Sequence, residues 1–505
     1  MSRVVIAGAG PVGLSLALGL ARYGIESTVL ERKPELDRHS RAIVLWPRTL
    51  EIFAQWGVLD VFTDAAPRRN AISLYAAETG ARVFELDLTC IGDQTETPYS
   101  LILPQDRTER LLLDAVRSTG LVDVLFETEV VGVHDRGDRV DVTAQRADGT
   151  TLQSEGAYLV GADGARGFVR EALGYELEGK TYPLRTLLAD IVIPDERDLL
   201  PFPRAAAMQQ HVLGAVRYAQ NTWRMVAMFR HDEISDETDL QALLPERVAQ
   251  IFGEGPFETI WLSLFRTHAR RASHFAHGRV ALAGDAAHLN SPAGGQGMNA
   301  GIADAHNLAW KLARALHGGD GVTLLESYDV ERRDAIAGDV ERFTDALTRA
   351  AMLTPPMRLA ALSALDLALK KPPRARGAAR RIGMLDIPYR RSTLFDPLAE
   401  RVGHRAANVL VKGRRLYAYA GLDALLLAYR APGSRAIPES ELRDATDGLM
   451  GVRTLVVDGD RAIGHAWKAS RSFVALIRPD HYVGLLLRAW TPQSLREGVR
   501  RALAA

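Results

Sequence analysis

The chain has 505 residues, enough for two or three domains, and its 62 basic and 62 acidic residues give a formal net charge of zero. A neutral chain has no overall field that would attract nucleic acid or an anionic membrane, so neither is expected as a partner. Cys90 is the only cysteine, which excludes an intrachain disulfide, a two-cysteine redox motif and a cysteine metal cluster.

The N-terminal segment predicts a dinucleotide site. Residues 3–7 are an apolar run typical of a buried strand, and Gly8-Ala-Gly-Pro-Val-Gly13 follows as a G-x-G-x-x-G motif before a helical pattern. A second strand, residues 27–31, ends in Glu31, where an acid suits ribose hydroxyls and disfavours a 2′-phosphate. FAD or NAD therefore fits better than NADP. Glycines and a proline break this apolar segment, so we expect neither a signal peptide nor a membrane span. We therefore expect a cytoplasmic protein.

Two later strand ends also carry a glycine followed by an acid. Residues 158–161 lead into Ala162-Asp163-Gly164, and the apolar run 280–283 leads into Gly284-Asp285. A turn rich in proline and glycine, residues 292–299, then precedes a helical pattern. Free amides and the positive end of the helix dipole at such a terminus favour an anionic or electron-rich ligand. Taken alone, the stretch also fits a tight strand–helix connection whose glycines serve only the turn.

The remaining segments predict other layers. Residues 180–270 interleave aromatic, methionine and arginine residues in alternating runs, which favours a second, mostly β layer. The helical region 302–371 ends in a basic cluster, residues 370–381, which we interpret as a solvated helix end and linker rather than a nucleic-acid site. His274 and His277 have no neighbouring acids or cysteines, so no metal site is expected.

Taken in order, the three glycine–acid motifs resemble those of the single-component FAD-dependent aromatic hydroxylases, the p-hydroxybenzoate hydroxylase class of flavoprotein monooxygenases. The resemblance is to the bacterial branch that acts on phenols, aromatic polyketides and antibiotics. It implies an α/β fold with a Rossmann-like FAD-binding domain split over residues 1–178 and 271–395. An interleaved β-sheet substrate domain would occupy residues 179–270, and a thioredoxin-like domain without cysteines would occupy residues 396–505.

The resemblance also implies cofactor contacts. The residues expected to bind FAD are Gly8, Gly10, Val12, Gly13, Glu31, Arg32, Arg41, Gln105, Val130, Asp163, Asp285, Gly297, Met298 and Asn299. The first glycines would hold the pyrophosphate and Glu31 the ribose. The amides of residues 297–299 would face the flavin's pyrimidine carbonyl, where negative charge accumulates on reduction.

The implied activity is an NAD(P)H-driven monooxygenation. NAD(P)H would reduce FAD, and a C4a-hydroperoxyflavin formed with O2 would transfer oxygen to an aromatic, phenolic or polyketide-like substrate. Baeyer–Villiger oxygen insertion on the same scaffold and a non-catalytic flavin-binding protein stay open as alternatives.

No catalytic base stands out from the sequence. The flavin-wall candidates are Pro292, Gly295 and Gln296. The candidates in the substrate segment are His211, Arg217, Tyr218 and Tyr182, chosen only for their position. The sequence does not identify the substrate. It does not distinguish NADH from NADPH as the reductant, or a monomer from a homodimer.

Overall fold

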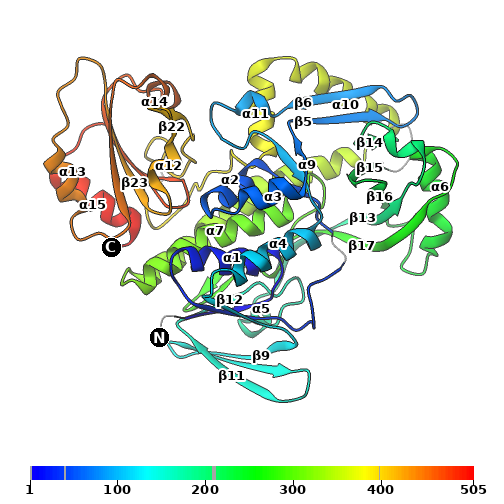
Figure 1. The fold of residues 1–505 in the computed structure, drawn as a ribbon, viewed down its shortest axis with the longest axis horizontal. Helices are drawn as coiled ribbons and strands as arrows, with labels where there is room; N and C mark the ends of the chain where they lie inside the picture. The colour runs from blue at the N-terminus through cyan, green and yellow to red at the C-terminus, as the bar shows by residue number, and fades with distance from the viewer. Residues whose placement is uncertain (1–2, 39–40, 207–211, 397) are drawn as a thin grey trace.

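The computed structural model describes residues 3–38, 41–206, 212–396 and 398–505. Within these ranges the chain forms a mostly parallel sheet, a large mixed sheet and a smaller C-terminal sheet, joined by a central group of helices (Figure 1). The fold is mixed α/β, as predicted. No helix in these ranges has the length and apolar character needed to cross a bilayer.

The parallel sheet has six strands in the order β18-β19-β12-β1-β2-β8. β1 (Val4–Ala7) runs parallel to β12 (Tyr158–Gly161) on one side and to β2 (Ser27–Leu30) on the other. β19 (Val280–Leu282) extends the sheet in parallel beyond β12, and β8 (Val122–Leu125) does so beyond β2. All residues of β1, β2, β12 and β19 are buried, because parallel strands are covered on both faces and need apolar side chains throughout.

The second sheet has eight strands in the order β20-β17-β13-β16-β15-β14-β5-β6. Its long central strands are β13 (Leu177–Val192) and β17 (Glu258–Ala272). The flanking strands are β16 (Thr222–Arg230), β15 (Val212–Ala219), β14 (Arg204–Ala205) and β20 (His288–Leu289). One face packs on α6 (Leu240–Phe252), where the rings of Trp223 and Phe252 meet edge to face at 4.9 Å.

The sheet also takes in strands that the range 179–270 omits. β5 (Ala71–Ala76) pairs in parallel with β14, and β6 (Arg82–Asp87) follows β5 as an antiparallel partner. Only two residue pairs join β5 to β14, Arg204 with Tyr75 and Ala205 with Ala76. Such a short pairing between distant segments has no periodic signature in the sequence, and for this reason the predicted range misses the hairpin.

The helical region consists of several separate helices. They are α7 (Gly297–Leu316), α8 (Gly321–Ala335), a π-helical turn (Ile336–Val340), α9 (Glu341–Ala351), α10 (Pro355–Leu369) and α11 (Pro372–Ile382). The linker interpretation is wrong for α11, which packs against β6. Three of its four arginines are paired: Arg376 with Asp93 at 2.7 Å, Arg380 with Asp386 at 2.9 Å and Arg381 with Asp339 at 2.8 Å. Prolines at the first helical positions do not interrupt a helix, because no backbone hydrogen bond is lost there.

The C-terminal sheet has the order β24-β23-β25-β26. β23 (Ala424–Arg430) is parallel to β24 (Val452–Asp458) and antiparallel to β25 (Phe473–Ile477), which pairs with β26 (Val483–Leu487). Two helices, α13 (Glu439–Thr446) and α15 (Pro492–Leu503), pack together beside it. Figure 1 shows this unit, coloured orange to red, to one side of α7.

A buried ion network fastens this unit to the central helices. Arg478, in the turn between β25 and β26, donates to both oxygens of Glu331 on α8 at 2.6 and 2.8 Å. Lys311 on α7 donates to the same carboxylate at 2.8 Å, and Asn307 donates to Asp480 at 2.9 Å. The side chains of Arg478, Glu331 and Lys311 have no exposed area, so each charge depends on its partners for compensation.

Arg478→Met is expected to destabilise the protein by about 3–5 kcal/mol, because it leaves buried carboxylates short of a partner. The measurement is the melting temperature of the holoprotein. Arg488→Met serves as the matched control, since Arg488 pairs at 3.0 Å with the exposed Glu400 and its loss is expected to cost about 1 kcal/mol or less. Equal melting temperatures for the two variants would contradict the importance of the buried network.

Candidate functional site

The three glycine–acid turns lie side by side at one edge of the parallel sheet. β1, β12 and β19 are neighbours, so their carboxyl ends reach the same edge, where open α/β sheets bind ligands. Gly8 adopts a φ of +103°, and a Cβ there would lie 2.5 Å from the carbonyl oxygen of Ala162. The amide of Ala283 donates to the carbonyl of Gly161 at 2.9 Å. The turn after β1 thus contacts the turn after β12, and the end of β12 is hydrogen-bonded to the turn after β19.

Two helix N-termini meet above this edge. The side chain of Val12, near the start of α1 (Pro11–Arg22), fills the space between Gly284 and Gly301. A Cβ on Gly284 or Gly301 would lie 2.8 or 2.5 Å from its Cγ2. Val12 therefore acts through packing, and it draws the N-terminus of α1 against the first turn of α7.

Backbone donors are available at both termini. The first intrahelical bonds run from Leu14 to the Gly10 carbonyl in α1 and from Ala300 to the Gln296 carbonyl in α7. The amides ahead of these bonds have no acceptor within their own helix. They include those of Val12 and Gly13 in α1 and those of Gly297, Met298 and Asn299 in α7. A helix terminus of this kind favours a negatively charged ligand group.

The glycines divide into two groups by what surrounds them. A Cβ on Gly13 would lie 2.0 Å from the carbonyl oxygen of Gly8, so Gly13 is required by the fold. A Cβ on Gly10 or Gly297 would meet nothing within 4 Å. These two glycines border open space in front of the free amides, and that space fits a phosphate-bearing cofactor.

Glu31 already holds the glycine loop. Its carboxylate accepts from the amide of Ala9 at 2.8 Å and from the amide of Lys33 at 3.0 Å. Arg32 beside it is exposed and lies 3.7 Å from Glu129. Val130 lies on β9 (Thr128–Asp135), opposite Ala144 of the neighbouring strand, and is buried.

Asp285 follows β19 in the short 3-10 turn Gly284–Ala286, where the residue is exposed. Protein surrounds its carboxylate densely, although the residue still reaches solvent. This desolvation raises the pKa of Asp285, and the nearby His288 and Arg41 oppose the rise. A carboxylate that solvent reaches at this sheet edge fits a cofactor with hydroxyl groups to donate.

Asp304 fixes the turn that carries Asp285. One oxygen of the Asp304 carboxylate accepts from the amide of Gly284 at 3.0 Å and from His288 at 2.7 Å. The other oxygen accepts from Arg332 at 2.6 Å. Burial alone would raise the pKa of Asp304, but Arg332 and His288 hold it below its ordinary value. Sequence reasoning missed Asp304, although an acid on the buried face of a helix must have a partner.

Asp163 caps a short helix at the end of β12. Its Oδ2 accepts from the amide of Val169 at 3.0 Å at the start of α5 (Phe168–Ala172), while its Oδ1 is buried without a partner. Burial raises the pKa of this carboxyl. Protein encloses the unpaired oxygen, and a Cβ on Gly167 would lie 2.0 Å from it, so Asp163 serves to hold this turn.

Arg41 and Gln105 lie in neighbouring segments, since the amide of Gln105 donates to the carbonyl of Ala42 at 2.9 Å. The Arg41 guanidinium lies 5.0 Å from the ring centre of Phe265 on β17. The backbone carbonyl of Arg41 accepts a hydrogen bond from the Arg224 side chain at 3.0 Å. Gln105 begins α4 (Gln105–Arg117), and its side chain donates to Glu109 at 2.8 Å. Burial raises the pKa of Glu109 to about 7, with the Gln105 bond opposing the rise.

The Gly-rich turn, residues 294–297, is fastened by Trp46. The indole Nε1 of Trp46 donates to the carbonyls of Gly294 and Gly295, at 3.1 and 3.2 Å. The side chain of Asn299 bonds to the amide of Trp46 and the carbonyl of Val44, both at 2.9 Å, so only its backbone amide remains for a ligand. The Pro292 carbonyl accepts from Gly295 at 3.0 Å, and Gln296 is buried at the N-cap of α7.

A cavity of about 620 Å³ adjoins this turn. Val44 and Trp46 line it on the side of the turn, while Arg69, Phe202 and Arg217 line it elsewhere. Sequence analysis did not single out Trp46, Arg69 or Phe202, because their contacts join segments distant in sequence. The cavity volume lies in the range of small-molecule sites, about 300–1,000 Å³.

The candidates in the substrate segment do not converge. Arg217 lines the cavity and pairs with Asp198 at 3.1 Å. Tyr218 instead lies beside Asp190, where burial and the nearby carboxylate raise its pKa. Tyr182 donates to Asp345 at 2.6 Å. His211 lies outside the described residues. The three candidates that the structure describes, Arg217, Tyr218 and Tyr182, therefore do not form one catalytic cluster.

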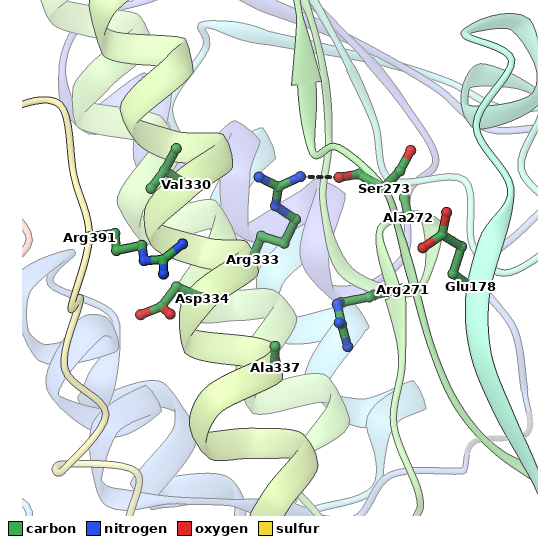
Figure 2. A pocket seen from close by; sticks show the side chains of 9 residues that line it. All are labelled: Glu178, Arg271, Ala272, Ser273, Val330, Arg333, Asp334, Ala337 and Arg391. Carbon is green, nitrogen blue, oxygen red and sulfur yellow. Dashed lines mark hydrogen bonds between the residues drawn. The ribbon is translucent and has the colours of Figure 1, made fainter.

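A second recess, of about 550 Å³, lies between the end of β17 and α8. Figure 2 shows Arg333 reaching Ser273 across it, with Asp334 and Arg391 at its other side. Its Arg271 pairs with Glu341 at 2.7 Å. No predicted cofactor residue lines either space, but two residues that line the first cavity, Val44 and Trp46, contact the Gly-rich turn. The cavity beside Trp46 is therefore the better candidate for a substrate.

Residues 1–344 match the family described as the FAD binding domain. The chain belongs to this family. It is an FAD-dependent monooxygenase, with NAD(P)H as its reductant, and the recognition of an aromatic hydroxylase from sequence is confirmed.

Relatives match along nearly the whole chain. An uncharacterized aromatic compound monooxygenase of Bacillus subtilis is 31% identical over 98% of this chain and 97% of its own length. A 12-dehydrotetracycline 5-monooxygenase/anhydrotetracycline 6-monooxygenase of Streptomyces rimosus is 31% identical over 99% of this chain and 97% of its own. The structure of an anhydrotetracycline hydroxylase of Streptomyces rimosus superposes with a TM-score of 0.79 at 27% identity, covering 100% of this chain and 99% of that one.

Gly10→Val is expected to abolish FAD retention while leaving the apoprotein folded. The added side chain points into open space, and the φ of −71° at Gly10 is ordinary for valine. The measurements are flavin content after purification and the apoprotein's melting temperature, which is expected to change by about 2 °C or less. Gly13→Ala, whose Cβ collides with backbone, is expected to lose the fold itself. Full flavin content in Gly10→Val would disprove the proposed cofactor position.

Proposed function

We propose that the enzyme hydroxylates a bulky aromatic substrate held in the cavity between Trp46 and Phe202. The observation that carries this proposal is that Trp46 both lines the cavity and bonds the Gly-rich turn at the N-terminus of α7. Bound FAD, once reduced by NAD(P)H, supplies the activated oxygen that is transferred to an electron-rich ring carbon. A substrate in this cavity would lie against the wall of the flavin site.

The pyrophosphate is assigned to the N-terminus of α1. Gly10 leaves space for it, Gly13 allows the tight turn, and the amides of Val12 and Gly13 can donate to its oxygens. Gly8 supports this site by letting β1 approach β12. Glu31 would bind the ribose with the carboxylate that already organises the loop.

The remaining contacts are assigned along the sheet edge. Asp285 would accept hydrogen bonds from the ribityl hydroxyls, and Gln105 would donate to them. Arg41 would offset phosphate charge, and Arg32 and the backbone of Val130 would lie at the adenosine end. Asp163 would hold the turn at the end of β12 beside the cofactor by capping α5. The amides of Gly297, Met298 and Asn299 would stabilise negative charge on the flavin's pyrimidine carbonyl, with Pro292, Gly295 and Gln296 as the adjoining wall.

The cavity itself favours a large, mostly apolar ligand. Ile72, Ile102 and Val216 line it together with Phe202, and such a lining keeps water away from the reacting carbon. Its volume is ample for a polycyclic ring system. The similarity to enzymes named for tetracycline intermediates supports the same substrate class. Arg217, already bonded to Asp198, would orient the substrate rather than act as a base.

The architecture supports three structural units with different functions. We assign residues 1–178 and 271–395 to FAD binding, 179–270 together with the β5–β6 hairpin to the substrate sheet, and 396–505 to a thioredoxin-like unit. The parallel β23–β24 pair followed by antiparallel β25 and β26, with α13 and α15 beside them, supports the last assignment. Without cysteine that unit has no disulfide chemistry.

The direct test is oxygen transfer from labelled O2. The holoenzyme is incubated with NAD(P)H, ¹⁸O2 and a panel of polycyclic phenols, and products are analysed by mass spectrometry. A hydroxylase is expected to oxidise NAD(P)H faster with a fitting phenol and to place one ¹⁸O atom on its ring. A lactone or ester bearing ¹⁸O would instead indicate Baeyer–Villiger insertion, and no labelled product with any phenol would refute the proposal.

Trp46→Phe is expected to uncouple the reaction. The variant loses the indole bonds to Gly294 and Gly295, so the wall between cofactor and cavity is less fixed and water enters. The expected result is more hydrogen peroxide released per NAD(P)H and less hydroxylated product, at unchanged flavin content. Trp490→Phe is the matched control, because it loses one indole bond, to Glu441 at 3.1 Å, in the C-terminal unit. Equal coupling in both variants would argue against this role for Trp46.

A further inference from the structure

The cavity contains a partly buried arginine with unused hydrogen-bonding capacity. Arg69, on β4 (Arg68–Arg69), lines the cavity with its guanidinium 4.5 Å from the ring centre of Phe202. Its Nε is buried and has no hydrogen-bond partner. A buried donor left unpaired costs roughly 1–3 kcal/mol, and more when it is charged. Nε itself is enclosed by protein, but the terminal nitrogens of Arg69 hydrogen-bond to no residue that the structure describes and are the donors a ligand in the cavity can reach.

The charges around Arg69 do not compensate it. Arg217 stacks on the same ring of Phe202 at 4.9 Å, and its own charge is met by Asp198. Arg68 lies over Tyr99 at 4.8 Å. In the part of the chain that the structure describes, no carboxylate forms a salt bridge with Arg68 or Arg69. Burial lowers the pKa of Arg69, and the positive charge of Arg217 lowers it further.

The position of Arg69 gives the cavity two chemically different ends. β3 (Val44–Leu45) and β4 both pair with β7 (Ser100–Ile102), on opposite sides. Val44 and Arg69 are therefore about 10 Å apart at ordinary strand spacing. Val44 and Trp46 adjoin the Gly-rich turn, whereas Arg69 lies at the far side of β7. The lining between them includes Ile72 and Ile102.

We propose that the substrate carries a carboxylate that Arg69 binds at the end of the cavity opposite Trp46. This inference rests on the proposed function, since it names the substrate class of the same cavity: an aromatic acid whose charged group lies about one fused-ring length from the reacting ring. A planar guanidinium suits a carboxylate, to which it can donate two parallel bonds. Arg68 also lines the cavity without a carboxylate partner, but it is exposed and lies over Tyr99, so the partly buried Arg69 is the arginine assigned to the carboxylate.

The test compares an acid with its neutral isostere. The probes are 6-hydroxy-2-naphthoic acid and 6-hydroxy-2-naphthamide, titrated into the holoenzyme, with the perturbation of flavin absorbance giving Kd. The acid is expected to bind the unmodified enzyme about tenfold or more tightly than the amide, the size of one charge-assisted hydrogen-bonded pair. Arg69→Met is expected to reduce this preference to about twofold or less, and Arg69→Lys to retain part of it.

Arg82→Met is the matched control, because Arg82 lies exposed on β6, does not line the cavity and pairs with Glu85. It is expected to keep the preference for the acid, and every variant is expected to keep its flavin. The inference is overturned if the unmodified enzyme binds acid and amide equally, if the acid does not bind, or if Arg69→Met keeps the preference. Because this readout needs no turnover, Arg69-dependent binding without any oxygenated product would refute the proposed function and leave the carboxylate site intact.

Discussion

The contact between Val12 and two glycines is the constraint on which the site depends. Gly284 and Gly301 approach the Val12 side chain so closely that neither position has room for a Cβ. This packing brings the N-termini of α1 and α7 together over the ends of β1, β12 and β19. The bond from the Gly284 amide to Asp304 then fixes the third turn against α7. Cofactor recognition by backbone amides requires such rigidity, because amides have no side-chain freedom with which to adapt.

Helix α7 connects every functional region of the molecule. Its first turn carries the free amides that we assign to the flavin, and Asp304 anchors the turn that carries Asp285. Asn307 and Lys311 join the buried ion network with Glu331 and Arg478. Nearly all of the helix from Met298 to Ala313 is buried. A C-terminal unit without redox cysteines therefore has a physical role: Arg478 and Asp480 complete the charge balance around α7, the helix to which we assign the flavin.

The features that sequence reasoning found are those with local signatures. The glycine–acid turns, the buried parallel strands and the start of α7 each follow from a short pattern, and the structure places them together at one sheet edge. The features it missed are made by pairing between distant segments: the β5–β14 contact, Trp46 on the Gly-rich turn, and Arg69 on Phe202. α11 was misjudged because a run of arginines has the same composition whether it is solvated or paired with acids from other elements. One signal was available, since polar residues within an otherwise buried helix, such as Asp304 and Lys311, must have partners.

The cavity must exclude water from the reacting carbon and also hold the substrate ring in one orientation. Oxygen transfer needs a dry site, which the apolar lining beside Trp46 provides, yet a ring with several equivalent carbons must be held in one orientation. A hydrogen bond near the reacting carbon would bring polarity and water to that position. Placing the orienting charge on Arg69, across β7 from Val44, separates the two tasks by roughly two strand spacings, or about 10 Å. The desolvation cost of the guanidinium is then offset only when a complementary anion occupies the cavity, so orientation and selection of the substrate depend on the same bond.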